Sequence, residues 1–218
     1  MEMRPDKFAA EREKIVQNDL IGRGIKDSRV IEAMRTIPRE EFVPAEYRDQ
    51  AYRDGPLPIG LDQTISQPYI VALMTQELKI SPGSEVLELG TGSGYQTVIL
   101  SKLAKKVYTI ERFERLSLSA QMVLKKLGIS NVEFSVGDGS CGWPEEKIFD
   151  RIMVTAAVPT IPEPLSKQLA EGGIIVAPID YGVMQDLLAF EKQGGTLREK
   201  SICYVRFVRL IGEYGFKE

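Results

Sequence analysis

The chain has 218 residues, of which 43% are hydrophobic and 27% are charged, and its formal net charge is −3. This composition is typical of a folded globular protein, and it excludes an intrinsically disordered chain and the overall basic charge that usually accompanies nucleic-acid binding. The chain has no histidine, so a histidine general base is excluded. Its two cysteines, Cys141 and Cys203, are far apart in the sequence, so the sequence indicates no zinc or other metal site and no disulfide framework.

The N-terminal part predicts two helices. Apolar residues recur every three or four positions over Lys7–Ile21 and again over Asp27–Ile37, with Gly22 between the two segments. Asp27 is placed to cap the second helix, and Pro38 ends it. The first residues lack the apolar core of a secretion signal, and no stretch is long and apolar enough to span a bilayer. We therefore expect a cytoplasmic protein that does not bind membranes.

A long connection rich in turn residues runs from Val43 to Ser66 and includes the segment Gly55–Gly60. Long ordered connections inside compact domains are usually functional or covering segments, so this one is a candidate lid or substrate wall. Pro68 then occupies a favoured first position for a helix, and apolar residues continue at helical spacing to Leu78.

Strands and helices alternate through the middle of the chain. Apolar runs predict strands at Glu85–Leu89, Val107–Glu111, Val132–Val136, Asp150–Thr155 and Gly173–Pro178, and helices at Tyr95–Leu103, Arg115–Leu127 and Glu163–Leu169. This alternation is typical of an α/β fold, a doubly wound and mostly parallel sheet with helices on both faces.

The last part of the chain predicts an antiparallel hairpin. Two strands, Asp186–Lys192 and Ser201–Leu210, flank a turn that contains Gly194 and Gly195. We therefore expect a single domain, 1–218, in three parts: a helical N-terminal extension with the substrate loop (1–80), a cofactor-binding α/β core (81–180) and the C-terminal hairpin (181–218).

A glycine-rich turn, Gly90-Thr91-Gly92-Ser93-Gly94, joins the first core strand to the helix that follows. Such a turn allows the backbone to approach a ligand and directs the free N–H groups of a helix N-terminus toward it. In the dinucleotide-binding fingerprint the third glycine would stand at the position of Tyr95, one residue later than Gly94. With Glu88 inside the preceding strand, the turn fits S-adenosylmethionine better than a pyrophosphate, although a tight connection without a ligand is the alternative.

Acidic residues follow the next two strands of the predicted sheet. Glu111 ends the second strand, and Asp138 lies just beyond the third. Ligands of open α/β sheets bind beyond the carboxyl ends of the strands, where Glu111 could accept hydrogen bonds from both ribose hydroxyls and Asp138 one from the adenine amine. The alternative is that both are ordinary polar strand ends.

At this point the sequence resembles the class I methyltransferases and, within them, the protein-L-isoaspartate O-methyltransferase family. The resemblance covers nearly the whole chain, and its most specific part is the segment Gln63-Thr64-Ile65-Ser66-Gln67-Pro68-Tyr69-Ile70-Val71-Ala72. One departure is Val208-Arg209-Leu210, where the family typically reads Val-Pro-Leu.

The resemblance implies a Rossmann-like methyltransferase fold and a reaction. A methyl group would pass from S-adenosylmethionine to the free carboxylate of L-isoaspartyl residues in damaged proteins, and the ester would then close to a succinimide and allow repair. Ser66 would be the catalytic residue, and the substrates would be isoaspartyl peptides and proteins. Separately, we expect a monomer that does not act on nucleic acid. The resemblance also implies that Gly90, Gly92, Glu111 and Asp138 contact the cofactor. The full set of cofactor-binding residues that we expect is Gln63, Thr64, Ile65, Gly90, Thr91, Gly92, Glu111, Arg112, Asp138 and Gly139.

The chemistry of a carboxylate acceptor agrees with this implication. A carboxyl group with a pKa of about 4 is already ionised at neutral pH, so its methylation needs no general base and the lack of histidine is no obstacle. The Ser66 hydroxyl could donate a hydrogen bond to one carboxylate oxygen and leave the other free to attack. The alternative for Ser66 is an N-cap of the helix that follows.

Four other functions remain open at this stage. An NAD-dependent dehydrogenase could also use Glu111, but the early Gly94 disfavours it. A nucleic-acid amine methyltransferase usually carries Asp/Asn-Pro-Pro-aromatic after the fourth strand, where this chain has Thr155-Ala156-Ala157-Val158-Pro159. The third alternative is a methyltransferase that acts on another substrate, and the fourth is a binding module without catalytic activity.

Overall fold

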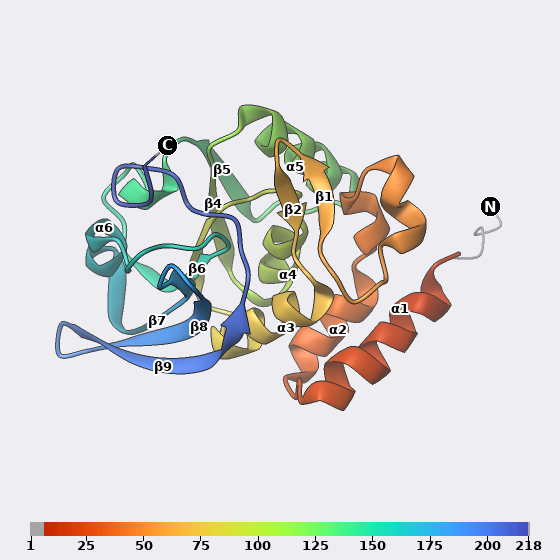
Figure 1. The fold of residues 1–218 in the computed structure, drawn as a ribbon, viewed down its shortest axis with the longest axis horizontal. Helices are drawn as coiled ribbons and strands as arrows, with labels where there is room; N and C mark the ends of the chain where they lie inside the picture. Colours follow the sequence, from red (N-terminus) through yellow and green to blue (C-terminus); the bar gives the residue numbers. More distant parts are fainter. Residues whose placement is uncertain (1–6, 218) are drawn as a thin grey trace.

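Seven strands form one sheet in the computed structural model, which describes residues 7–217. The order across the sheet is β5-β4-β3-β6-β7-β8-β9; the first five strands run parallel, and β8 and β9 are antiparallel to their neighbours (Figure 1). The bounds of the strands are β3 Glu85–Leu89, β4 Lys106–Glu111, β5 Val132–Val136, β6 Phe149–Val154, β7 Leu169–Asp180, β8 Gln185–Gln193 and β9 Thr196–Val205.

The chain leaves β3 toward one edge of the sheet and later returns to β6 on the other side of β3. This reversal creates a crevice at the carboxyl ends of β3 and β6, where ligands bind in open α/β sheets. The prediction of a doubly wound, mostly parallel sheet with an antiparallel C-terminal pair is confirmed.

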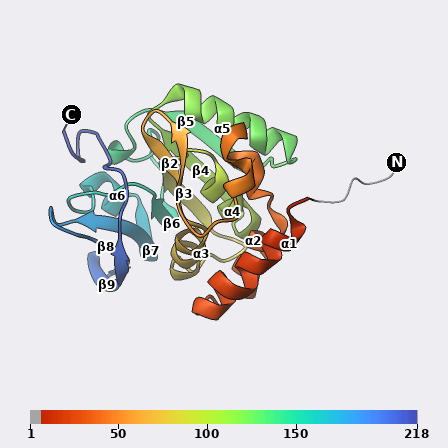
Figure 2. The same ribbon diagram turned by 45° about the vertical axis from the view of Figure 1, so that its right-hand side comes forward.

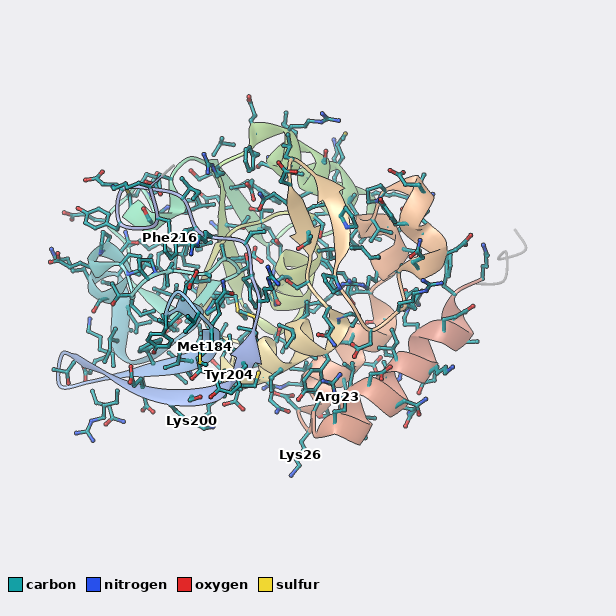
Figure 3. All side chains as sticks on the ribbon, viewed as in Figure 1. Arg23, Lys26, Met184, Lys200, Tyr204 and Phe216 are labelled. Carbon is teal, nitrogen blue, oxygen red and sulfur yellow. The ribbon has the colours of Figure 1, made fainter. Side chains whose placement is uncertain are left out.

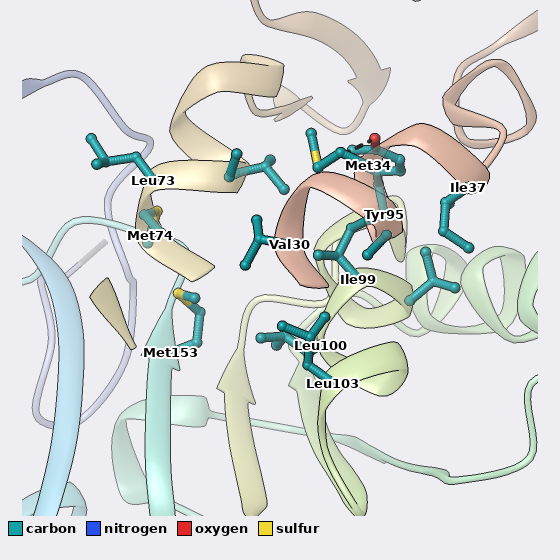
Figure 4. Close-up of a cluster of buried hydrophobic side chains, with 14 of the residues drawn as sticks. Val30, Met34, Ile37, Leu73, Met74, Tyr95, Ile99, Leu100, Leu103 and Met153 are labelled. Carbon is teal, nitrogen blue, oxygen red and sulfur yellow. Dashed lines mark hydrogen bonds between the residues drawn. The ribbon is translucent and has the colours of Figure 1, made fainter. Parts of the chain in front are cut away.

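Helices cover the two faces of the sheet unequally. On one face, α2 (Ser28–Thr36), α3 (Pro68–Glu77), α4 (Tyr95–Leu103) and α5 (Glu114–Lys126) contribute to a large hydrophobic cluster, part of which Figure 4 shows. The other face carries the short helix α6 (Glu163–Lys167) and loops. Figure 2 shows the N-terminal helices on the side of the molecule away from β7–β9.

The N-terminal extension is helical, but its first element is not one regular α-helix. The α-helix α1 (Ala9–Ile15) continues as a π-helical segment, η1 (Val16–Leu20), and as a 3₁₀ turn, η2 (Ile21–Arg23), which Gly24 ends with a φ of 95°. The predicted second helix is confirmed, including its cap, because the Asp27 side chain accepts a hydrogen bond from the backbone N–H of Arg29 at 2.9 Å.

Two boundary predictions near the C-terminus are wrong. The helix predicted to reach Leu169 stops at Lys167, because Leu169 already pairs with Phe149 as the first residue of β7. The last strand is β9, which begins earlier and ends earlier than expected, since residues 206–210 leave the sheet. The start of β9 was missed because Thr196–Lys200 lies in an edge strand that faces solvent, so its residues are polar and do not form an apolar run.

The long connection before α3 is more regular than expected. The 3₁₀ turn η3 (Arg39–Phe42) precedes it, and it contains a second 3₁₀ turn, η4 (Ala45–Gln50), and a small antiparallel sheet of β1 (Leu57–Gly60) and β2 (Gln63–Ile65). The two-residue turn between β1 and β2 places Leu61 and Asp62 at φ values of 53° and 56°. Such turns usually carry Asn-Gly, so this sequence gave no hairpin signal.

We predict that replacing Leu61-Asp62 with Asn-Gly stabilises the protein. A leucine in the left-handed region costs about 1 kcal/mol, and Asn-Gly relieves that strain. The midpoint of thermal unfolding should rise by roughly 2–4 °C for a chain of this size. Leu61→Ala is the control, because alanine keeps a Cβ atom at the same positive φ and should give no gain; an unchanged midpoint for the Asn-Gly variant would contradict the prediction.

Candidate active site

The glycine-rich turn lies in the crevice between β3 and β6. Gly90 adopts a φ of 92°, and a Cβ atom there would overlap the Thr155 hydroxyl, which donates hydrogen bonds to the Leu89 and Gly90 carbonyls at 2.8 and 2.6 Å. Gly94 has a φ of 87°, and its Cβ position is blocked by Ala120 of α5. Gly90 therefore keeps β3 and β6 close, whereas Gly94 allows α4 to pack against α5.

Glu111 lies at the end of β4 beside this turn and is only 5% exposed. One carboxylate oxygen accepts the backbone N–H of Gly92 at 2.9 Å, and the other accepts that of Phe113 at 3.0 Å. These bonds fix the carboxylate and leave further lone pairs that could accept hydroxyl groups of a ligand.

Asp138 is held mainly by the protein itself. Its Oδ1 accepts hydrogen bonds from the Ser140 backbone and hydroxyl at 2.8 and 2.7 Å, and its Oδ2 accepts the backbone N–H of Glu213 at 2.7 Å. Partial burial alone would raise the pKa of Asp138, but the hydrogen bonds from Ser140 and Glu213 hold it below its ordinary value. Asp138 thus anchors the C-terminal segment, which passes over it so closely that Gly212 has no room for a side chain.

Three adjoining hollows bring the predicted cofactor residues together. The central one lies between the carboxyl ends of the strands and the segment 208–211; it borders on Gln63, Thr64, Gly90, Gly92, Glu111, Arg112 and Gly139. The second, which shares Arg112, Gly137 and Ile211 with it, reaches Asp138. The third, on the side of α3, borders on Ile65, Ser66 and Thr91.

Ser66 also opens onto a separate cavity of about 430 Å³, which we call the acceptor groove. Its lining includes Pro56, Ser66, Gln67, Ile70 and residues 204–208, which form the end of β9 and the segment just after it. Thr64 and Thr155 border the acceptor groove, the central hollow and the hollow beside α3, so the three spaces meet at these two threonines.

Ser66 does not cap the helix that follows it. The N-cap of α3 is Gln67, without a side-chain cap bond, and the Ser66 hydroxyl has no hydrogen-bond partner within residues 7–217. This hydroxyl is therefore available to a ligand in the acceptor groove.

Arg39 positions Ser66 and was missed by the sequence analysis. Its side chain is fully buried; Nε donates to the Ala51 carbonyl and Nη2 to the Ser66 carbonyl, both at 2.8 Å, and the guanidinium lies 4.9 Å from the Tyr95 ring. Burial lowers the pKa of Arg39 to about 10, which leaves it charged at neutral pH. Nothing in the local sequence indicates that Arg39 contacts a residue 27 positions away.

The C-terminal segment closes the central hollow by backbone pairing. Val208 accepts the N–H of Ala157 at 2.7 Å, and Leu210 donates to the Ala157 carbonyl at 2.8 Å. The Arg209 side chain pairs with Asp180 at 3.1 Å and lies 4.5 Å from the Phe216 ring. Neither backbone bond uses the Arg209 N–H, so a proline at this position would remove neither of them.

Glu88 supports the glycine turn from below. It is fully buried; Oε2 accepts hydrogen bonds from the hydroxyls of Thr97 and Thr109 at 2.6 and 2.7 Å, and the Thr109 hydroxyl lies 2.6 Å from that of Thr91 in the turn. Burial raises the pKa of Glu88 to about 8. Within residues 7–217 no group of three or more acidic residues or cysteines could hold a metal ion.

Comparison with known proteins gives consistent matches. Residues 10–215 match the family model described as Protein-L-isoaspartate(D-aspartate) O-methyltransferase. Proteins named protein-L-isoaspartate O-methyltransferase from Dictyoglomus turgidum and Syntrophobacter fumaroxidans (number 1 in the latter) are 51% and 48% identical to the chain. These alignments cover 97% and 96% of this chain and 96% and 98% of the relatives.

A solved structure is also similar over almost its whole length. It is a Plasmodium falciparum protein described as a protein-L-isoaspartate O-methyltransferase in complex with S-adenosyl-L-homocysteine. Its TM-score to this chain is 0.81 at 29% identity, and the match covers 92% of this chain and 98% of that one.

We predict that Glu88 makes stability depend on pH. Its pKa rises from an ordinary value of 4.5 to about 8 on folding, so between these values the unfolded chain releases a proton that the folded protein keeps. The free energy of unfolding should therefore fall as pH rises from about 5 to 8, by at most about 1.4 kcal/mol per pH unit from this group.

Glu88→Gln tests this prediction because glutamine does not titrate. In urea unfolding between pH 5 and pH 8, the variant should gain stability relative to the unsubstituted protein as the pH increases. Glu133→Gln, on the exposed side of β5, is the control and should show no such trend. A stability difference for Glu88→Gln that stays constant with pH would rule out the titration.

Proposed function

Since the chain belongs to the protein-L-isoaspartate(D-aspartate) O-methyltransferase family, we propose that its crevice residues hold the cofactor and that Ser66 directs the acceptor. The protein transfers a methyl group from S-adenosylmethionine to the carboxylate of L-isoaspartyl residues, the first step of their repair. The observation that carries the residue assignment is that the acceptor groove, the central hollow and the hollow beside α3 meet at Thr64 and Thr155.

The residues of the central hollow fit S-adenosylmethionine, which supplies an electrophilic methyl group on a sulfonium. Glu111 is a buried carboxylate with lone pairs left for ribose hydroxyls, and Gly90 and Gly92 let the backbone approach without side chains. Gln63, Thr64 and Arg112 border the same space. Ile65 and Thr91 border the space next to it, and Asp138 and Gly139 complete the far end.

The acceptor carboxylate needs orientation and not a base. A hydroxyl at Ser66 donates to one carboxylate oxygen, so the other oxygen faces the junction at Thr64 and Thr155. Arg39 fixes the Ser66 backbone from behind and adds a positive charge that favours an anionic acceptor in the groove.

The family membership argues against the alternative of a dehydrogenase. The missing side chain of Gly94 makes room for Ala120 and Leu124 of α5, which is a packing role inside the protein. We also propose that residues 1–218 form a single domain; residues 1–6 and 218 lie outside the part of the chain that the structure describes. One hydrophobic cluster joins Ile15 of the N-terminal extension to Leu187 of β8, which supports that reading.

We also propose a cytoplasmic monomer that acts on neither nucleic acid nor membranes, in keeping with the net charge of −3. Within residues 7–217, no helix combines the length and the apolar character that crossing a membrane requires.

The decisive test of the reaction uses two synthetic peptides that differ only in an isoaspartyl or a normal aspartyl linkage. With labelled S-adenosylmethionine, we expect base-labile label in the isoaspartyl peptide alone, because its free carboxylate is bonded directly to Cα, whereas the carboxylate of a normal aspartyl residue lies one methylene further from the main chain. Equal labelling of both peptides, or none, would refute the specificity.

We predict that Ser66→Ala lowers kcat at least tenfold and leaves the dissociation constant of S-adenosyl-L-homocysteine within about twofold. Loss of one well-placed hydrogen bond to a charged group costs about 1.5–3 kcal/mol, which is the basis of this estimate. Ser119→Ala, on α5, is the control and should leave kcat unchanged. Unchanged turnover of Ser66→Ala at normal stability would remove Ser66 from the mechanism.

A further inference from the structure

Four large apolar side chains are exposed together at the end of the antiparallel strands. We call this group the apolar corner: Tyr181, Val183 and Met184 in the turn between β7 and β8, and Tyr204 near the end of β9, exposed to 58%, 93%, 49% and 74%. Tyr204 pairs with Asp186, two residues beyond Met184, and Figure 3 shows Met184 and Tyr204 at the same end of the sheet. Nothing inside residues 7–217 covers them.

The turn that carries the apolar corner is held in place. Asp180 accepts the backbone N–H of Gly182 at 2.7 Å and pairs with Arg209 at 3.1 Å. The Tyr181 N–H donates to the Met184 carbonyl at 2.9 Å. Because the turn is already ordered, binding to it costs little further conformational entropy.

The apolar corner is also tied to the acceptor groove. The Gln185 side chain donates to the Phe207 carbonyl at 3.2 Å and accepts the Phe207 N–H at 2.6 Å. Phe207 and Tyr204 both line the acceptor groove, so the apolar corner continues its rim at a fixed position.

We propose that the apolar corner binds a large apolar side chain of the substrate polypeptide within a few residues of the isoaspartyl site. The inference rests on the proposed acceptor groove, because an acceptor carboxylate at Ser66 makes the neighbouring substrate residues cross this rim. A segment in that position is unfolded and extended, and the apolar corner selects those segments that expose aromatic or branched aliphatic side chains. A second copy of the chain is a poor fit, since stable interfaces use about 20–30 residues a side.

The test compares two isoaspartyl peptides that differ only in the residues flanking the acceptor, Leu and Phe in one and Ser in the other. Steady-state kinetics and a direct dissociation constant from fluorescence anisotropy are measured for both. We expect the apolar peptide to have a KM and a dissociation constant about 5–20-fold lower, with similar kcat, from the partial burial of one or two side chains.

The double variant Val183→Ser/Met184→Ser should reduce this preference to about twofold or less and leave kcat and the KM of the Ser-flanked peptide unchanged. Met122→Ser is the matched control, because Met122 is 68% exposed on α5 and lies outside the acceptor groove. It should retain the full preference.

Two results would overturn the proposal: equal dissociation constants of the two peptides for the unsubstituted protein, or a preference that survives in the double variant. A shift from dimer to monomer caused by the double variant, seen by size-exclusion chromatography, would assign the apolar corner to a second copy instead. If neither peptide is methylated, the proposed function fails, and the dissociation constants alone decide the role of the apolar corner.

Discussion

A buried arginine that forms no ion pair with a carboxylate of residues 7–217 holds the acceptor half of the active site together. Arg39 binds the carbonyls of Ala51 and Ser66 and packs on the ring of Tyr95, so one side chain joins the connection after α2, the loop before α3 and the first turn of α4. Burying an unpaired charge costs several kcal/mol, and two hydrogen bonds to neutral carbonyls offset only part of that cost. A buried arginine is therefore expected where the charge and the planar hydrogen-bond donors of its guanidinium group have a function, and here the guanidinium group of Arg39 binds the Ser66 carbonyl.

The electrostatics of the crevice suit a reaction that removes charge. An anionic acceptor and a cationic donor become neutral as the methyl group transfers, so a water-poor enclosure favours the reaction relative to bulk water. Burial raises the pKa of Glu88 to about 8 and keeps this carboxyl group mostly neutral at pH 7. Among residues 7–217, the carboxylate that lines the central hollow is that of Glu111. The glycine turn is thus supported by hydroxyl and carboxyl hydrogen bonds without a second negative charge beside the donor.

The parallel sheet and the cofactor half of the site could be predicted because they depend on local pattern. Buried parallel strands read as apolar runs, and a residue that ends such a strand lies at the ligand edge whatever the rest of the chain does. Glu111 and the turn at Gly90 were found in this way. Thr155 could have been found by the same rule, since it directly follows β6, but its packing against Gly90 depends on the spacing of two strands 65 residues apart.

Ser66 was expected from the resemblance, but the contacts that hold Ser66 and the C-terminal segment could not be predicted, because they join irregular segments distant in sequence. Arg39 reaches Ser66, Asp138 reaches Glu213, and the segment at Val208 pairs with Ala157; none of these contacts leaves a periodic pattern. The same construction explains how the site tolerates change. Because the segment 208–210 is held through the Val208 carbonyl and the Leu210 N–H, the side chain between them is free to serve another purpose. In this chain Arg209 uses that freedom to brace Asp180, and with it the turn beside the acceptor groove.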